Sequence, residues 1–299
     1  MPGRWAAAGG APIESIEAAR REFAEKIRGL AALRSDGLVR ALASVPREEF
    51  VGPGPWQIIR PSEFGRGYVA TPNADPRHLY DNVLVALDPS RHLNNGEPAA
   101  LARWLDSLAL VAGDRLLHIG CGVGYYTAIA AEALKPGGSV VGVELDRELA
   151  ARARQNLRRW QNVTVVSGDG GHRQAGAFDA IFVNAGATEP ISWWLDGLRI
   201  EGRLLLPLTV DYPLENHGAG HMLLVVRHAE GYSARFVSPV GIYHCAGART
   251  DEGNDLLKRA YLKGGHDGVR RLRREEHPRD AQCWLHAPGF CLSRVAVEA

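Results

Sequence analysis

Short apolar runs alternate with amphipathic stretches through the middle of the chain. Runs of strand length occupy 115–120, 139–145, 163–169, 178–185 and 203–209. Helical patterns follow the first two runs at 125–134 and 147–160, and a shorter one near 191–199 precedes the last. Strands that are separated by helices predict an α/β fold, in which a parallel sheet carries helices on both of its faces.

Helical patterns also precede this alternation. Apolar residues recur at helical spacing over 14–33, and a second helix is predicted over 36–43. A third is predicted over 97–109, with Pro98 at the first helical position, where its missing N–H costs nothing. Residues 51–76 between them are crowded with Pro and Gly and are predicted to be irregular. A loop of this length is typical of a segment that covers or lines a site.

The C-terminal third begins with two more apolar runs. Residues 221–229 and 232–240 predict a β-hairpin at the edge of the sheet. A helix is predicted near 251–263, and the basic run 270–274 is interpreted as a solvated helix face, because two glutamates follow it at once. The last residues form a short apolar end.

Composition and charge narrow the class of protein. The chain has 299 residues, 45% of them hydrophobic, and 35 Lys and Arg against 34 Asp and Glu, so its formal net charge is +1. This balance gives no global field that would favour nucleic acid or a membrane surface. No apolar run approaches the ~20 residues of a membrane span, and the first residues lack the apolar core of a signal peptide. We expect a soluble, cytoplasmic protein that binds neither nucleic acid nor membrane.

The spacing of the four cysteines matches no common disulfide or zinc-binding pattern. They stand at 121, 245, 283 and 291, without a C-x-x-C pair. Cys283, His286 and Cys291 are close in sequence, as are His244 and Cys245, but these spacings differ from those of the common structural zinc sites. We expect buried thiols and no metal.

Glycines at alternate positions mark the turn after the first strand of the alternation, where residues 120–124 read GCGVG. In open α/β sheets a ligand lies outside the carboxyl ends of the strands, beside this turn. The dinucleotide fingerprint G-x-G-x-x-G would place its third glycine at Tyr125, so the spacing does not fit NAD or FAD. A nucleoside without a pyrophosphate, or a plain tight turn, remains.

Polar residues at the next strand ends favour the nucleoside. Glu144 closes the strand 139–145, about 20 residues after the glycines, where a carboxylate accepts both hydroxyls of a ribose. Asp169 ends the next strand and is placed to accept the exocyclic amine of adenine, and Asn184 follows the strand after that. Each residue alone has an ordinary structural interpretation, as a solvated strand end or a turn. Together they predict a site for S-adenosylmethionine.

The predicted cofactor-binding residues are His118, Gly120, Cys121, Gly122, Gly124, Tyr125, Glu144, Leu145, Asp169, Gly170 and Asn184. Two of them also have a structural interpretation. His118 lies on the strand itself, where a satisfied core histidine is common. Cys121 has no His–Asp arrangement beside it that would activate the thiol, which favours a packing role.

The sequence around this loop resembles the protein-L-isoaspartate O-methyltransferases. SVPREEFV at 44–51 resembles their "VPR…FV" segment, LYDN at 79–82 loosely resembles their "Y-x-D", and the glycine loop with its helix matches theirs, including the aromatic Tyr125. Residues 178–208 resemble their "D-x-I-x-V-x-A-A" strand with the following helix and glycine turn, and HMLLVVRHAEGYSARFVSPV is similar to their closing hairpin. The resemblance runs over roughly 36–247.

This resemblance implies a Rossmann-like class I methyltransferase that uses S-adenosylmethionine. It divides the chain into a flexible tail at 1–13, an N-terminal helical and substrate-side segment at 14–110, a cofactor-binding domain at 111–247 and a C-terminal appendix at 248–299. The implied activity is O-methylation of a carboxylate on a peptide or protein. Such a nucleophile is already ionised at neutral pH and needs no general base.

The substrate segment departs from the family pattern "G-Q-T-I-S-x-P". The corresponding residues run from His92 to Pro98, with Gly96 in place of the serine and Glu97 beside it. An isoaspartyl carboxylate loses a hydroxyl donor here and meets a negative charge, so the resemblance supports cofactor use more than repair of damaged proteins. We predict that Asn94 and Asn95 contact the substrate, although Asn–Asn–Gly also suits a turn. His92 is the candidate base for an amine or carbon acceptor.

Two other functions stay open. One is methylation of a small molecule in a closed pocket formed by residues 51–76 and the C-terminal appendix. The other is a cofactor-binding interaction module without catalysis, for which the altered substrate segment is a sign of lost activity. A peptide substrate that forms a succinimide after esterification is as compatible with the sequence as general repair.

Overall fold

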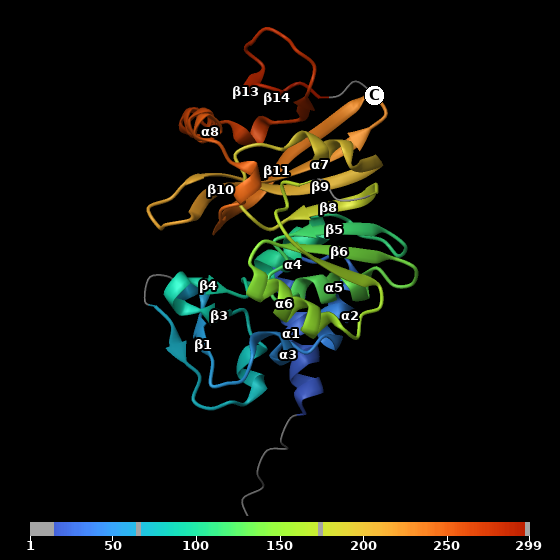
Figure 1. Cartoon of the computed structure of the whole chain (residues 1–299), viewed down its shortest axis with the longest axis vertical. Helices are drawn as coiled ribbons and strands as arrows, with labels where there is room; N and C mark the ends of the chain where they lie inside the picture. Colours follow the sequence, from blue (N-terminus) through green and yellow to red (C-terminus); the bar gives the residue numbers. More distant parts are fainter. Residues whose placement is uncertain (1–14, 64–66, 173–175, 297–299) are drawn as a thin grey trace, which may run out of the picture.

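The computed structural model describes residues 15–63, 67–172 and 176–296, and the predicted flexible tail at 1–13 lies outside them. One large sheet runs through the molecule in the order β13-β14-β12-β11-β10-β9-β8-β5-β6-β7 (Figure 1). Its strands are β5 (Arg115–Ile119), β6 (Ser139–Glu144), β7 (Val163–Ser167), β8 (Phe178–Val183), β9 (Leu198–Asp211), β10 (His217–His228), β11 (Gly231–Tyr243), β12 (Arg271–Arg273), β13 (Cys283–Ala287) and β14 (Phe290–Ser293). The strands from β5 to β9 are parallel and the rest pair antiparallel, which confirms the Rossmann-like α/β prediction.

Helices cover both faces of this sheet, as Figure 1 shows. Packed with one face are α1 (Ile16–Ala31), α2 (Asp36–Ser44), α3 (Glu48–Val51), α4 (Pro98–Ser107), α5 (Tyr125–Ala133) and α6 (Arg147–Leu157). The other face is covered by α7 (Ser192–Asp196) and α8 (Asp251–Lys263). Each side has its own buried cluster of apolar side chains, so the sheet separates two cores.

Local signals account for where the helices begin. Ser15, Ser35, Asp146 and Thr250 cap α1, α2, α6 and α8, each side chain accepting a backbone N–H of the first turn. Pro98 occupies the start of α4, as predicted. Helix α5 differs, because it follows Gly124 with no side-chain cap and is buried on nearly every side between the sheet and α2. Its start is therefore shaped by packing and by the glycine turn.

A second, smaller sheet takes two of its strands from the segment 51–76, which was predicted to be irregular, and the other two from the residues that follow. Its order is β2-β1-β3-β4, with β1 (Gln57–Ile59), β2 (Val69–Ala70), β3 (Leu84–Asp88) and β4 (Leu93–Asn94). Short 3₁₀ turns connect these strands at Pro61–Glu63, Pro76–Leu79 and Pro89–Arg91, and two more lie at Ala246–Ala248 and His266–Gly268. Trp56, Ile58 and Val85 contribute to a small core of its own. The strands are too short to give a periodic signal among so many Pro and Gly residues.

The C-terminal part corrects two predictions. Strand β11 pairs with β12 as well as with β10, so the β10–β11 hairpin is inside the sheet and not at its edge. The prediction that the basic run forms a helix face is wrong, because Arg271–Arg273 is strand β12, with Leu272 buried between two arginines. An alternation of three residues is too short to distinguish from a helical face by sequence. Helix α8 is confirmed at Asp251–Lys263.

Within the described ranges, none of the helices is long and apolar enough to cross a membrane.

Candidate functional site

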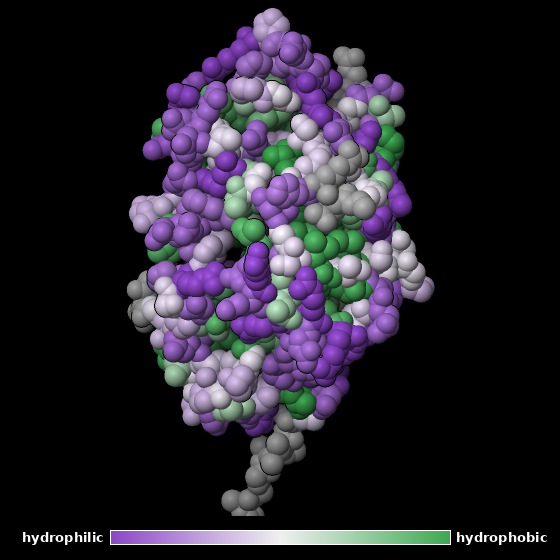
Figure 2. Space-filling model, viewed as in Figure 1, coloured by the Kyte–Doolittle hydropathy of each residue, from purple (hydrophilic) through white to green (hydrophobic). Residues whose placement is uncertain are grey.

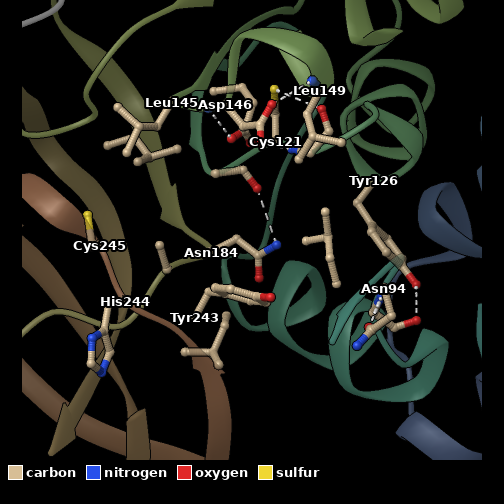
Figure 3. A pocket seen from close by; sticks show the side chains of 18 of the residues that line it. Asn94, Cys121, Tyr126, Leu145, Asp146, Leu149, Asn184, Tyr243, His244 and Cys245 are labelled. Atoms are coloured by element: carbon tan, nitrogen blue, oxygen red, sulfur yellow. Dashed lines mark hydrogen bonds between the residues drawn. The ribbon is translucent and has the colours of Figure 1, made fainter. Parts of the chain in front are cut away.

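A cavity of about 700 Å³ lies where the carboxyl ends of β5, β6, β8 and β11 meet the segment after β4 and the start of α4 (Figure 3). A hollow is visible on one face of the molecule between the levels of β10 and β4 (Figure 2). His217 of β10 and Leu93 of β4 both line the cavity. Its volume is in the range of small-molecule and cofactor sites. The position is the one predicted for a ligand of an open α/β sheet.

The glycine turn brings bare backbone to the rim of this cavity. Gly120 has φ +74°, and a Cβ there would lie 2.8 Å from the carbonyl oxygen of Asn184, so only glycine allows β5 and β8 to approach this closely. At Gly122, which lines the cavity, nothing lies within 4 Å of the position a Cβ would take. The turn therefore leaves room for a ligand beside its backbone.

Glu144 is buried at the end of β6 and lines the cavity. The N–H of Gly122 donates to its Oε2 at 2.7 Å, and the N–H of Asp146 donates to its Oε1 at 3.0 Å. Burial raises the pKa of the Glu144 carboxyl above its ordinary value, although these two backbone donors oppose the shift. The carboxylate is thus held in one orientation, and both of its oxygens retain lone pairs for further donors.

Asp169, Gly170 and Asn184 line the same cavity from the next strand ends. The N–H of Gly171 donates to Asp169 Oδ1 at 2.7 Å, and the side-chain amide of Asn184 donates to the Gly120 carbonyl at 3.4 Å, as Figure 3 shows for Asn184. Leu145 is half exposed and adds an apolar side chain to the cavity lining. The structure therefore brings these predicted residues together with Glu144.

Three of the predicted cofactor residues lie away from the cavity. His118 is buried in the core, stacked on Phe182 with ring centroids 4.9 Å apart, and its Nδ1 lies 2.9 Å from Thr127 Oγ1. Burial lowers its pKa to about 3, so it is a neutral core histidine. Tyr125 is also fully buried, and Gly124 serves packing, because a Cβ there would lie 2.6 Å from Leu157 Cδ1. These three residues were assigned to the cofactor because they are close to the loop in sequence. The sequence does not show in which direction each side chain points.

Cys121 lines the cavity but is not activated. Burial, reinforced by the neighbouring Glu144, raises the pKa of its thiol well above the ordinary value. A neutral thiol is a poor nucleophile. Its packing against Gly142, where a Cβ would lie 3.2 Å from the sulfur, accounts for its place in the loop.

The three predicted substrate residues separate in the structure. Asn95 is buried and lines the cavity, and no acceptor in the described part of the chain lies within hydrogen-bonding distance of its Nδ2. Asn94 also lines the cavity, but its Oδ1 accepts the N–H of Gly96 at 2.8 Å and so stabilises a turn. His92 is exposed, with φ 55°, and lies outside the cavity lining. This geometry does not support His92 as a base.

The cavity includes residues that the sequence interpretation missed. Arg91 lies at the cavity and pairs with Asp146 at 2.8 Å, and Trp104 and Tyr126 form an aromatic wall. Tyr243 and His244 come from the end of β11, and Tyr243 points into the space between Asn184 and Asn94 (Figure 3). The Oη of Tyr243 is buried and without a hydrogen-bond partner among the described residues. The strand order could have indicated Tyr243 and His244, because β11 runs in the same direction as β9 and its carboxyl end lies at the same rim of the sheet.

Comparison with known proteins gives one consistent family. The profile of the family described as Protein-L-isoaspartate(D-aspartate) O-methyltransferase matches residues 76–231. The protein-L-isoaspartate O-methyltransferase of Staphylothermus marinus is 32% identical over 244 residues, covering 76% of this chain and 96% of the relative. That of Ignicoccus hospitalis is 28% identical over 230 residues, covering 75% and 96%.

Solved structures agree with this fold. A protein-L-isoaspartate O-methyltransferase superposes with a TM-score of 0.60 at 22% identity, over 81% of this chain and 69% of that one. A Plasmodium falciparum protein of the same description, in complex with S-adenosyl-L-homocysteine, gives a TM-score of 0.57 at 19% identity, over 76% and 98%. At these identities the likeness concerns the fold.

Proposed function

This chain belongs to the protein-L-isoaspartate O-methyltransferase family, and we propose that its cavity holds S-adenosylmethionine against a carboxylate of a peptide or protein. Membership makes the chain an S-adenosylmethionine-dependent methyltransferase. The residue roles and the nature of the acceptor are the parts that we infer from the geometry.

The residues at the strand ends fit this cofactor. Glu144 is oriented for the two ribose hydroxyls, and Asp169 with Gly170 lies at the next strand end for the adenine base. The open space beside Gly122 admits the amino acid part close to the loop backbone. When bound, the cofactor supplies an electrophilic methyl group on its sulfonium. The protein's own task is to orient the acceptor and to exclude water.

Two buried donors without partners carry the assignment of the acceptor. Asn95 Nδ2 and Tyr243 Oη belong to residues that line the same cavity, and each is unpaired among the described residues. Buried donors of this kind are costly unless a ligand accepts from them. A carboxylate supplies acceptors only, and it is already ionised at neutral pH. We infer that Asn95 and Tyr243 hold the carboxylate in line with the methyl group.

This arrangement differs from a serine-based substrate site. Gly96 has φ +75°, and a Cβ there would lie 2.9 Å from Leu101 Cδ2, so the backbone is not built to carry a serine. The negative charge of Glu97 is partly satisfied, because Asn82 Nδ2 donates to its Oε1 at 2.8 Å. These features support a dedicated peptide carboxylate as acceptor over general isoaspartyl repair.

Labelling with methyl-tritiated S-adenosylmethionine tests the proposal. The purified chain is incubated with cell extract, and labelled peptides and proteins are separated from labelled metabolites. We expect label on peptide material and its release as methanol in mild base, which is diagnostic of a carboxyl ester. Parallel reactions with synthetic aspartyl and isoaspartyl peptides compare the two acceptors. Label that is stable to base, or that appears only in metabolites, contradicts the proposal.

A small-molecule acceptor is the second candidate. Leu84, Leu87 and Leu101 line the part of the cavity beside Trp104, and such apolar walls are typical of small-ligand pockets. Base-stable label in a single metabolite would favour this function over the peptide.

A further inference from the structure

Four potential metal ligands converge at the outer end of the large sheet. The ligand atoms of His277, Cys283, His286 and Cys291 all lie within 4.8 Å of one another. Three of these residues were noted from the sequence, but their spacings matched no common zinc motif, and His277 was not connected with them. The four residues come together only in the folded structure, and their spacing in the sequence does not indicate it.

The β13–β14 hairpin explains the convergence. His286 pairs directly opposite Cys291, so their side chains share one face of the sheet. Cys283 and His286 are three positions apart, which in a regular strand places side chains on opposite faces. The pairing shifts register between Cys283 and Leu285, and this irregularity returns Cys283 to the face of His286. His277 completes the group from the irregular segment 274–282, which follows β12.

The two imidazoles are oriented as ligands. His277 Nδ1 lies 2.8 Å from the carbonyl oxygen of Pro278, which can only accept, so Nδ1 carries the proton and Nε2 carries a lone pair. His277 Nε2 and His286 Nδ1 are both buried, and neither has a hydrogen-bond partner in the described part of the chain. Metal-bound histidines commonly donate their other N–H to a backbone carbonyl, as His277 does. Two buried ring nitrogens are therefore available as metal ligands.

The thiols and their surroundings complete a closed site. Cys283 and Cys291 are both buried, with side chains inside the cluster. Asp280 Oδ1 accepts the backbone N–H groups of Gln282 and Cys283, which fixes the turn that carries the first thiol. Two sulfurs and two imidazole nitrogens are the donor set of tetrahedral structural zinc sites. None of the four residues lines the cofactor cavity, so the group is separate from methyl transfer.

We propose that His277, Cys283, His286 and Cys291 bind one zinc ion, which fastens the segment 274–282 to the β13–β14 end of the large sheet. With four protein ligands the site is structural and has no open position for catalysis. Strand β13 is the last strand of the sheet (Figure 1), where an unpaired edge invites association with other chains. A metal that holds the neighbouring segment in place stabilises this edge.

The first test measures metal in the full chain, purified under reducing conditions without chelator. We expect about one zinc per chain by inductively coupled plasma mass spectrometry. Replacement of the zinc by Co²⁺ is expected to give the intense visible bands of tetrahedral cobalt and a thiolate charge-transfer band. A reduced chain that binds neither zinc nor cobalt, or one in which Cys283 and Cys291 form a disulfide, overturns the proposal.

Variants assign the ligands. Cys283→Ser and Cys291→Ser are expected to reduce the zinc content at least tenfold, whereas Cys245→Ser, a matched change of a buried thiol elsewhere, retains it. His277→Cys is expected to keep the metal and to strengthen the thiolate-to-cobalt band, a result that a merely unfolded segment does not produce. Unchanged zinc in the Cys283→Ser/Cys291→Ser double variant, or an unchanged cobalt spectrum in His277→Cys, contradicts the assignment. All of these readouts are independent of methyltransferase activity.

Discussion

Glu144 has its orientation fixed before any ligand arrives. The backbone N–H groups of Gly122 and Asp146 hold one oxygen each, so the carboxylate connects the glycine turn to the end of β6. Its burial makes the charged form costly, and its pKa is raised as a result. A residue held in this way contributes affinity through charge and geometry together.

Replacing Glu144 with glutamine removes the charge and one of the two acceptor oxygens, so the backbone N–H of Gly122 or of Asp146 then faces an amide N–H₂. The amide keeps the size but accepts hydrogen bonds from the ribose more weakly, and it accepts through one atom only. We expect a loss of about 2 kcal/mol, or roughly thirtyfold in Kd for S-adenosylmethionine. Isothermal titration calorimetry measures this, with Glu148→Gln on the exposed first turn of α6 as the control. An unchanged Kd removes Glu144 from the proposed cofactor site.

The same residue gives the cofactor affinity a dependence on pH. Because the folded-state pKa of Glu144 is raised, its proton returns at a higher pH than that of an ordinary glutamate. Protonation removes the charged acceptor, so affinity is full above this pKa and declines as the pH falls through it. Titrations across mildly acidic pH are expected to show weaker binding in the native chain and a flatter profile in Glu144→Gln. Equal slopes in both proteins would assign the pH dependence to other groups.

The backbone and surroundings of Gly96 disfavour a larger residue at this position. A serine there meets both a left-handed backbone and the side chain of Leu101. We expect Gly96→Ser to lower the free energy of unfolding by about 1–2 kcal/mol and to leave isoaspartyl methylation no faster. Gly113→Ser is the matched control, because Gly113 also has positive φ but nothing lies within 4 Å of its missing Cβ. Urea denaturation compares the two, and equal losses would show that the Leu101 contact contributes nothing.

At the scale of elements, strand ends account for most of the site. The rule that ligands lie beyond the carboxyl ends of parallel strands located Glu144, Asp169 and Asn184 correctly at the cavity, because β5 to β8 carry strong apolar signals. The same rule applied to β11 would have found Tyr243, but that strand was interpreted as an edge hairpin. His118 and Tyr125 were misplaced because sequence distance does not give side-chain direction.

The end of β4 and the residue after it are two asparagines with different roles, which a pair of variants distinguishes. Asn94 caps the turn through Gly96, so Asn94→Ala is expected to cost about 1 kcal/mol of stability. Asn95→Ala removes a buried amide whose Nδ2 has no partner among the described residues, so it is expected to leave stability nearly unchanged. It should nevertheless lower kcat/KM for the acceptor tenfold or more, with the Kd for S-adenosylmethionine preserved. An unaffected rate would leave Asn95 as a turn residue only.

At the scale of the whole molecule, a buried cation connects the start of α3 to the segment that carries the small sheet. The guanidinium of Arg47, beside α3, is completely buried and donates to the carbonyls of Leu79 at 2.8 Å and Val83 at 2.7 Å, with a longer contact to Gly96 at 3.5 Å. These carbonyls belong to the chain that leads into β3 and to the turn that forms one wall of the cavity. The sequence around Arg47 resembles a family motif, but only the fold shows which carbonyl groups the arginine binds.

Arg47 should therefore act on the substrate side of the site more than on the cofactor side. Arg47→Met keeps the apolar stem but leaves the carbonyls of Leu79 and Val83 buried without their donor, and we expect a loss of about 3 kcal/mol in the free energy of unfolding. Arg47→Lys should recover only part of this, because one ammonium cannot reproduce the planar fork. In the fraction that stays folded, KM for the acceptor is expected to rise while the Kd for S-adenosylmethionine changes little, since none of the carbonyls bound by Arg47 belongs to the glycine turn or to Glu144. Equal loss of acceptor and cofactor binding would instead mean that the two sheets respond as one unit, and that Arg47 supports the whole cavity.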